Sequence, residues 1–434
     1  MSFPARRDTI RRFALMATGM LALLGGLWAG LHRLGWAGPV LQPALPAAHG
    51  PLMVCGFLGT VISLERAVAL GRAWAFLAPG CTGGGALLTL AGLGGDAGPL
   101  LVTVGSLGLV AIFGVVVSIQ PDPFALVMGG GALAWTVGNG LWLVGWPVHT
   151  LVPWWIGFLV LTIAGERLEL SRMLFHAGWT RHLFFGLVGL LGLALVLSIR
   201  APDPGFRGMG LGLITIAGWL GIYDMARRTV TAEGLTRFIA VCLLAGYVWL
   251  AAGGGLALAY GNTGAGLVYD ATLHAVFVGF VFSMIFGHAP VIFPSVLGVS
   301  IPYRPFFYVH VALLHGTLLL RIAGDLGGPV AGRMWGGWGN AAAILLFLGA
   351  TVSSAAIGER EEGAPSPDAP QDEPTYSDRP DASDIPDLEL DSEAIAHRFV
   401  TALTRDALSR STTPALSDAT LLTRPFRATF PNQS

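Results

Sequence analysis

Long apolar runs separated by short polar breaks dominate the sequence from residue 13 to residue 357. Each run has about 20 mostly apolar residues, the length that an α-helix needs to cross a bilayer. The breaks contain Gly, Pro, Asn and Asp, which favour turns. The pattern predicts an all-α membrane protein with about 12 transmembrane helices, at residues 13–31, 49–69, 74–93, 98–119, 124–145, 150–168, 182–199, 207–226, 237–259, 268–289, 306–324 and 338–357.

The composition supports a membrane protein and excludes several other classes. Of the 434 residues, 53% are hydrophobic and only 12% are charged, so an ordinary soluble domain is excluded. The net charge of -1 gives no reason to expect nucleic acid as a partner, and the lipid bilayer is the expected one. The three cysteines form no Cys-x-x-Cys pair, so neither a disulfide framework nor a zinc site is indicated.

The arginines predict how the chain is oriented in the membrane. All basic residues other than histidine are arginine. With twelve spans and the basic segment 1–12 in the cytoplasm, thirteen arginines before the tail fall on the inner side and five on the outer side. Because cytoplasmic loops carry the positive excess, we expect both termini to be cytoplasmic. The first apolar run has no A-x-A-type cleavage site, so a retained helix in the cell inner membrane is expected.

The composition changes abruptly at residue 358. Segment 358–434 is rich in Pro, Asp, Glu and Ser and has too little apolar surface to form a core, so a disordered acidic tail is predicted. Within it, residues 391–408 have apolar positions at helical spacing and could form a short amphipathic helix. That helix could lie on the membrane, bind a protein partner, or have no role.

An internal repeat links the second, sixth and tenth predicted helices. Gly56-Phe57-Leu58 is followed after six residues by Glu65-Arg66, and the sixth helix has the same pattern with Glu166-Arg167. In the tenth helix, Gly279-Phe280-Val281 is followed at this spacing by His288-Ala289. The three helices are four apart in order and run in the same direction. The repeat predicts a pseudo-threefold arrangement of three four-helix arcs.

Five histidines fall in the predicted spans, where ionisable side chains are costly and indicate function. His49 and His274 lie near the outer ends of the second and tenth helices, where facing imidazoles could ligate a haem iron. His315 lies near mid-membrane and could extend that site as a further metal ligand, while His288 and His310 near the inner face could form a proton path. Each of the five could instead join helices through a hydrogen bond.

Helical spacing and proline rules give two further expectations. His274 and His288 are fourteen residues apart, which in an α-helix returns to nearly the same face. Pro290 disfavours helical geometry before it, so we expect the helix to end near His288, where the helix dipole favours a protonated ring. The Glu65-Arg66 and Glu166-Arg167 pairs are expected to anchor an interface, with proton uptake as the alternative.

The sequence resembles the NnrS family of haem- and copper-associated membrane proteins, themselves similar to the catalytic subunits of haem–copper oxidases. The resemblance is carried by AHGPLMVCGF at 48–57, by LHAVFVGF at 273–280 and by GHAP at 287–290. It implies haem, with copper as a possible second cofactor, His49 and His274 as ligands, and a role in nitric oxide, denitrification or respiratory stress handling. The sixth and seventh helices lack the histidines that hold copper in the oxidases, so neither a dinuclear centre nor proton pumping is expected.

Two other function classes fit the sequence. A multi-pass transporter could line a path for a small solute or ion with the His, Tyr and Asp side chains of the tenth and eleventh helices. Many transporters have inverted repeats, whereas the repeat here is parallel. A non-catalytic membrane scaffold could act through the acidic tail. Whether the protein is an enzyme is left open by the sequence.

Overall fold

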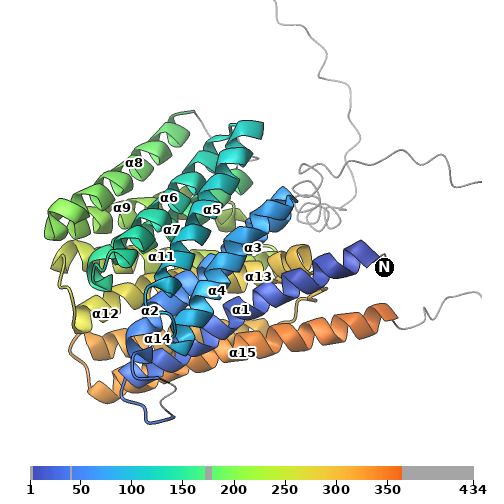
Figure 1. Cartoon of the computed structure of the whole chain (residues 1–434). Coiled ribbons are helices and arrows are strands. Elements are labelled where there is room, and N and C mark those ends of the chain that lie inside the picture. Colours follow the sequence, from blue (N-terminus) through green and yellow to red (C-terminus); the bar gives the residue numbers. More distant parts are fainter. Residues whose placement is uncertain (1–2, 40–41, 172–177, 364–434) are drawn as a thin grey trace, which may run out of the picture. The chain divides into compact units, whose positions relative to one another are not determined.

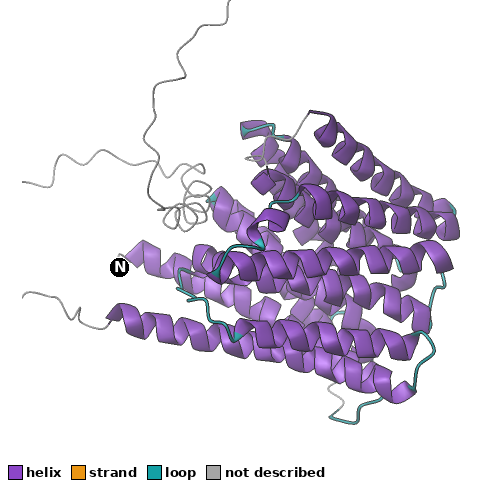
Figure 2. Ribbon diagram, turned by 180° about the vertical axis from the view of Figure 1, so that it is seen from behind, coloured by secondary structure: helices purple, strands orange, loops and turns teal. Residues whose placement is uncertain are grey.

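The computed structural model describes residues 3–39, 42–171 and 178–363. Within these ranges no residue forms a β-strand, and twelve helical segments are long and apolar enough to cross a membrane (Figure 2). The all-α, twelve-span prediction is therefore confirmed. Figure 1 labels most elements, which are α1 (Phe3–Arg33), η1 (Leu45–Ala48), α2 (His49–Pro51), η2 (Leu52–Leu58), α3 (Gly59–Leu70), η3 (Ala73–Phe76), α4 (Leu77–Ala91), α5 (Ala97–Ile119), α6 (Pro123–Leu143), α7 (Val148–Ser171), α8 (Gly178–Arg200), α9 (Pro202–Tyr223), α10 (Ala226–Thr229), α11 (Gly234–Tyr260), α12 (Leu267–His274), η4 (Ala275–Val281), α13 (Phe282–Leu297), α14 (Phe307–Asp325) and α15 (Val330–Gly363).

The terminal helices extend beyond the predicted spans. Helix α1 begins at Phe3 rather than at residue 13, so the basic segment 1–12 is largely helical. Helix α15 ends at Gly363, so the predicted start of the disordered tail at 358 is wrong by several residues. Glu and Arg are good helix formers, which explains why the polar ends continue the helices. The rest of the tail, including 391–408, lies outside the described residues.

The three helices that carry the repeat are the most buried spans. Buried residues make up 61% of the span Leu45–Leu70, 78% of Val148–Ser171 and 67% of Leu267–Leu297, against 56% or less in every other span. The central helices contact one another through α3 and α13 and through α7 and η4. Helices α1 and α15, blue and orange in Figure 1, lie side by side. The pseudo-threefold arrangement of four-helix arcs stays a prediction.

The outside of the bundle is suited to lipid. Large apolar side chains such as Leu107, Leu193 and Val248 are more than half exposed. A soluble protein rarely exposes so much apolar surface, whereas a lipid-facing surface requires it. The fold therefore places the polar side chains of the spans mainly between helices.

Two π-helical segments strengthen the repeat. Segment η2 begins four residues before Gly56 and ends two residues after it, and η4 has the same position around Gly279. A π-helix bonds each residue to the fifth one along and is frequently found at functional sites. Its appearance at matching positions of the first and third repeats indicates that both helices are adapted to one site.

The π-helix corrects the expectation that His274 and His288 share one face. Each π residue turns about 20° less than an α residue, so the seven residues of η4 rotate the remainder of the span by roughly a third of a turn. His288 accordingly contacts Arg167 of α7, with Nη1 3.3 Å from Nε2. The two histidines face different compartments of the bundle.

The expected helix end at His288 is also wrong. Helix α13 continues through Pro290 and Pro294 to Leu297, and Gly298 caps it with a φ of +73°. Membrane helices tolerate internal proline where neighbouring groups satisfy the freed carbonyls. His288 is therefore inside a helix, and the helix-dipole argument for its protonation no longer applies.

The charged pairs of the repeat join different helices, as the interface interpretation predicts. Arg66 bonds Glu166 of the next repeat, and Arg167 reaches His288 of the third. Arg167 also donates two hydrogen bonds to the buried Asp224, at 2.7 and 3.1 Å. The equivalent positions of the three central helices thus meet in one charged cluster.

Candidate histidine site

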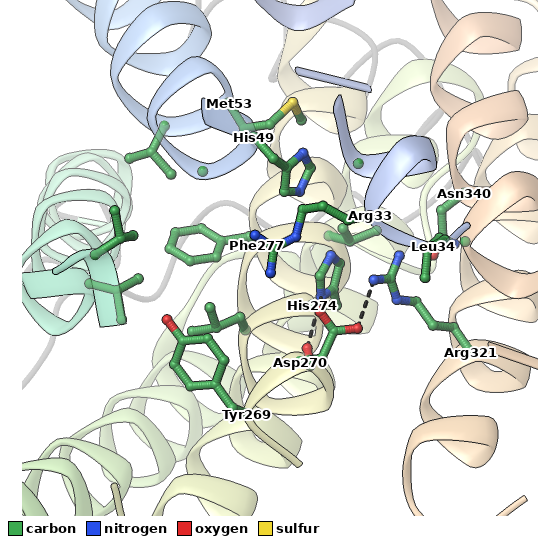
Figure 3. Close-up of a pocket in the computed structure, with 18 of the residues that line it drawn as sticks. Arg33, Leu34, His49, Met53, Tyr269, Asp270, His274, Phe277, Arg321 and Asn340 are labelled. Carbon is green, nitrogen blue, oxygen red and sulfur yellow. Dashed lines mark hydrogen bonds and ion pairs between the residues drawn. The ribbon is translucent and has the colours of Figure 1, made fainter. Parts of the chain in front are cut away.

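A cavity of about 650 Å³ lies between the second and tenth spans at the end of the bundle opposite the charged cluster. We call it the histidine pocket. Side chains from α1, η2, α7, α12, α14 and α15 contribute to its walls (Figure 3). Its volume falls within the roughly 300–1,000 Å³ typical of small-molecule and cofactor sites.

His49 and His274 point into this pocket with nearly parallel rings. The ring centroids are 6.3 Å apart and the ring planes differ by 10°. Nδ1 of His49 donates to the carbonyl oxygen of Gly26 at 2.7 Å, and Nδ1 of His274 donates to that of Asp270 at 2.8 Å. A carbonyl accepts only, so each neutral ring carries its proton on Nδ1 and keeps the Nε2 lone pair free. This is the tautomer that a metal ligand requires.

Two glycines on α1 make room for His49. Gly26 supplies the accepting carbonyl, and a Cβ at Gly30 would lie 2.8 Å from Cε1 of His49. Small residues four apart allow membrane helices to approach closely. Gly26 and Gly30 therefore fix the depth and rotation of the His49 ring.

Replacing Gly30 by alanine tests this positioning. We expect Gly30→Ala to displace the His49 ring and to weaken binding of haemin, the candidate ligand that the sequence suggests, by about 10–100-fold, as loss of an outer-shell partner does. Titration of purified protein with haemin, followed by absorption, measures the effect. Gly114→Ala is the matched control, because a Cβ there meets no atom within 4 Å. Equal affinities in the two variants would contradict the positioning role.

A group of four charged side chains, two of them buried and two partly buried, borders His274. The Asp270 carboxylate accepts from Nη2 of Arg321 at 2.7 Å and lies 3.4 Å from Nδ1 of His274. Arg333 lies 3.0 Å from Asp325, whose side chain is fully buried. We call these four residues the Asp–Arg quartet. Its charges compensate one another within the described part of the chain.

Close packing of α14 against α15 positions the quartet. A Cβ at Gly336 would lie 2.5 Å from the backbone nitrogen of Arg321, and one at Gly324 would lie 2.4 Å from that of Arg333. The two helices therefore touch backbone to backbone at both arginines. This contact holds both guanidinium groups beside the pocket.

One further cation lies at the pocket mouth. Arg33 ends α1 and is exposed, and among the described residues it forms no hydrogen bond or ion pair. Figure 3 shows its side chain reaching between the two histidines and Tyr269. Arg33 adds a positive charge at the pocket mouth, outside the quartet. The mouth is suited to an anionic group.

The deeper part of the pocket is apolar. Met53, Leu58, Phe277 and Phe282 line it, and the fully buried Trp155 closes the α7 side. Nε1 of Trp155 donates to Oδ1 of Asn139 at 3.0 Å, which fixes the indole ring. The pocket therefore combines a charged mouth, two imidazoles and an apolar floor.

His315 does not line the histidine pocket. Its Nδ1 accepts a hydrogen bond from Nε1 of Trp249 at 2.9 Å. The indole N–H can only donate, so the neutral imidazole carries its proton on Nε2 and has no free lone pair for a metal. The geometry does not bring His315 together with His49 and His274.

Neither His288 nor His310 lines the histidine pocket, and the two residues contact different neighbours. Arg167 donates to Nε2 of His288, whose Nδ1 donates to the carbonyl of Met284. His310 is buried among phenyl rings, the nearest being Phe286 at 4.7 Å, and neither ring nitrogen has a hydrogen-bond partner in the described residues. The proton path through these two residues stays a prediction.

Several pocket residues were not identified from the sequence. The sequence analysis used Arg33, Arg321 and Arg333 only to count positive charges on each side of the membrane, and it assigned no role to His149, which borders the pocket mouth. The arginines near the ends of apolar runs were a usable signal, since charged residues in spans indicate function. Their convergence depends on the glycine contacts between α14 and α15.

The donor set fits two-point ligation. Among the described residues, no group of three or more His, Cys, Asp or Glu side chains is placed to hold a metal ion. The paired imidazoles offer two nitrogen ligands from two different spans. Such a pair suits a metal whose remaining ligands come from a bound organic ring system.

Comparisons with known proteins give one match. A family model described as "Domain of unknown function (DUF8744)" matches residues 12–356, which covers all twelve spans. No curated protein and no solved structure matches the chain. The description of the matching family names no ligand or activity.

Proposed function

The chain belongs to the DUF8744 family, whose description names no activity. From the geometry of the site, we propose that the protein is an integral membrane haem-binding protein in which His49 and His274 are the two ligands of the haem iron. The pocket is the part of the described structure that supports this proposal. The NnrS resemblance of the second and tenth spans points to the same cofactor.

The paired imidazoles carry the proposal. A metal ion bound to both Nε2 atoms at about 2.0–2.1 Å would hold the two ring centres roughly 6 Å apart. The observed centroid distance is 6.3 Å, and both rings have the tautomer that leaves Nε2 free. Backbone carbonyls, which cannot move independently of the helices, hold both Nδ1 atoms. The site is therefore preorganised for ligation.

The surroundings fit the remainder of a haem. The apolar floor suits the macrocycle, whereas the unpaired guanidinium of Arg33 suits a carboxylate of the propionate groups. Met53 and Phe277 place apolar side chains in the wall of the pocket beside the two imidazoles. A haem with both axial positions filled by histidine supplies one-electron transfer.

The biological setting is part of the proposal. The link to nitric oxide, denitrification or respiratory stress handling comes from the resemblance to the NnrS family alone. Copper is omitted from the proposed site, because His315 lies outside the pocket and its Nδ1 is engaged by Trp249. The positive-inside count supports the cell inner membrane, with both termini in the cytoplasm.

The experiment is purification of the full chain in mild detergent after expression with haem available. We expect one non-covalently bound haem per chain, with the absorption spectrum of a six-coordinate low-spin iron. A protein that folds as a helical bundle by circular dichroism, yet neither carries haem nor takes up haemin in a titration, would overturn the proposal.

A further inference from the structure

We propose that Asp270 and Arg321 are positioning residues that make the two histidine ligands unequal, by setting the electron-donor strength of His274 and so the reduction potential of the site. This inference rests on the proposed function. Asp270 and Arg321 lie beside the ligand His274, and in this proposal they act through His274 without contacting the haem.

The contacts at His274 place both charges close to its ring. The backbone carbonyl of Asp270 accepts the Nδ1 proton at 2.8 Å, and the carboxylate of the same residue is 3.4 Å from that nitrogen. Arg321 bonds the other side of the carboxylate at 2.7 Å. A negative neighbour makes an imidazole a stronger donor, and a positive one weakens it.

His49 lacks this arrangement. Its Nδ1 donates to the neutral carbonyl of Gly26, and within the described ranges no carboxylate lies within ion-pair distance of its ring. The two ligands come from repeat-related helices but receive different electrostatic support. The asymmetry therefore originates in the third repeat and in the helices α14 and α15 packed against it.

The free-energy cost of placing these charges between membrane helices indicates that the quartet has a function. Burying charges between membrane helices costs several kcal/mol per ion before pairing, and an apolar substitute is often as stable. The side chains of Asp325, Arg321 and Asp270 are only 0%, 9% and 16% exposed. Arg333, 3.9 Å from Asp270, lets the carboxylate keep a cationic neighbour when Arg321 is changed. The Asp270 carboxylate therefore retains one cationic neighbour in an Arg321 variant.

The test measures the midpoint potential of the haem-loaded full chain by mediated redox titration. We expect Asp270→Asn to raise the potential, because a negative charge beside His274 is lost. Arg321→Gln is expected to lower it, because a positive charge is lost from the same place. Arg321→Lys keeps the charge and is expected to retain a potential closer to that of the unchanged protein than Arg321→Gln does.

Opposite shifts distinguish electrostatic tuning from a merely structural role, since loosened packing would move both variants in one direction. Shifts of the same sign, or none in variants that keep the low-spin spectrum, would overturn the inference while leaving haem binding intact. If Asp270→Asn does not fold, the comparison of Arg321→Gln with Arg321→Lys decides. Absence of haem from the unchanged protein would overturn the proposed function and this inference together.

Discussion

His49→Ala and His274→Ala are each expected to abolish the low-spin haem spectrum of the purified protein. Each substitution removes one of the two Nε2 donors of the paired rings, and the one other described histidine that lines the pocket, His149, lies at its mouth. The loss of haemin affinity should exceed the roughly 10–100-fold typical of changes to outer-shell partners, because a ligand itself is removed. Haemin titration and absorption spectra of the two single variants measure it.

Two control substitutions separate ligation from general damage. His182 is exposed on α8, so His182→Ala should keep the spectrum of the unchanged protein. His315→Ala should keep it as well, although loss of the Trp249 bond can lower stability. Retention of the low-spin spectrum in either His49→Ala or His274→Ala would contradict the ligand assignment.

Arg167→Met is expected to lower the stability of the folded bundle by about 3–5 kcal/mol, the cost of removing one partner of a buried ion pair. The Arg167 guanidinium holds Asp224 with two hydrogen bonds and also contacts His288. Without it, the fully buried carboxylate of Asp224 keeps the hydrogen bond from the backbone N–H of Ala226 but loses its cationic partner. Thermal unfolding in detergent, followed by circular dichroism, gives the size of the loss.

A double variant and an exposed pair make this prediction specific. Arg167→Met combined with Asp224→Asn should be less destabilised than the sum of the two single changes, because no uncompensated charge is left. Asp8→Asn breaks the exposed pair with Arg11 and should leave the unfolding midpoint nearly unchanged. Equal destabilisation by Asp8→Asn and Arg167→Met would refute the view that the charged cluster holds the three repeats together.

The sequence predicted the spans well because their signal is local. An apolar run of about 20 residues has few alternatives to a membrane helix, so all twelve were found. The juxtaposition of His49 and His274 was also predicted, because the repeat relates their helices and both lie near the same membrane face. These predictions needed only run length, direction and depth.

Helix phase and helix-to-helix contact were harder to predict. The residue types at 275–281 do not predict a π-helix, so the sequence analysis missed the rotation that turns His288 away from His274. Pro290 biases against a helix without forbidding one, and the packed surroundings of α13 outweigh the bias. The place of Arg321 beside Asp270 depends on Gly336, whose missing Cβ matters only once α15 lies against α14.

Electron paramagnetic resonance of the ferric full-length protein tests the central claim most directly. Two neutral imidazoles with ring planes only 10° apart should give one low-spin rhombic signal, as parallel axial ligands do. That signal, accounting for one haem per chain and absent from both His49→Ala and His274→Ala, is the result we expect. A high-spin signal from the unchanged protein, or a low-spin signal that survives either substitution, would contradict bis-histidine ligation by this pair.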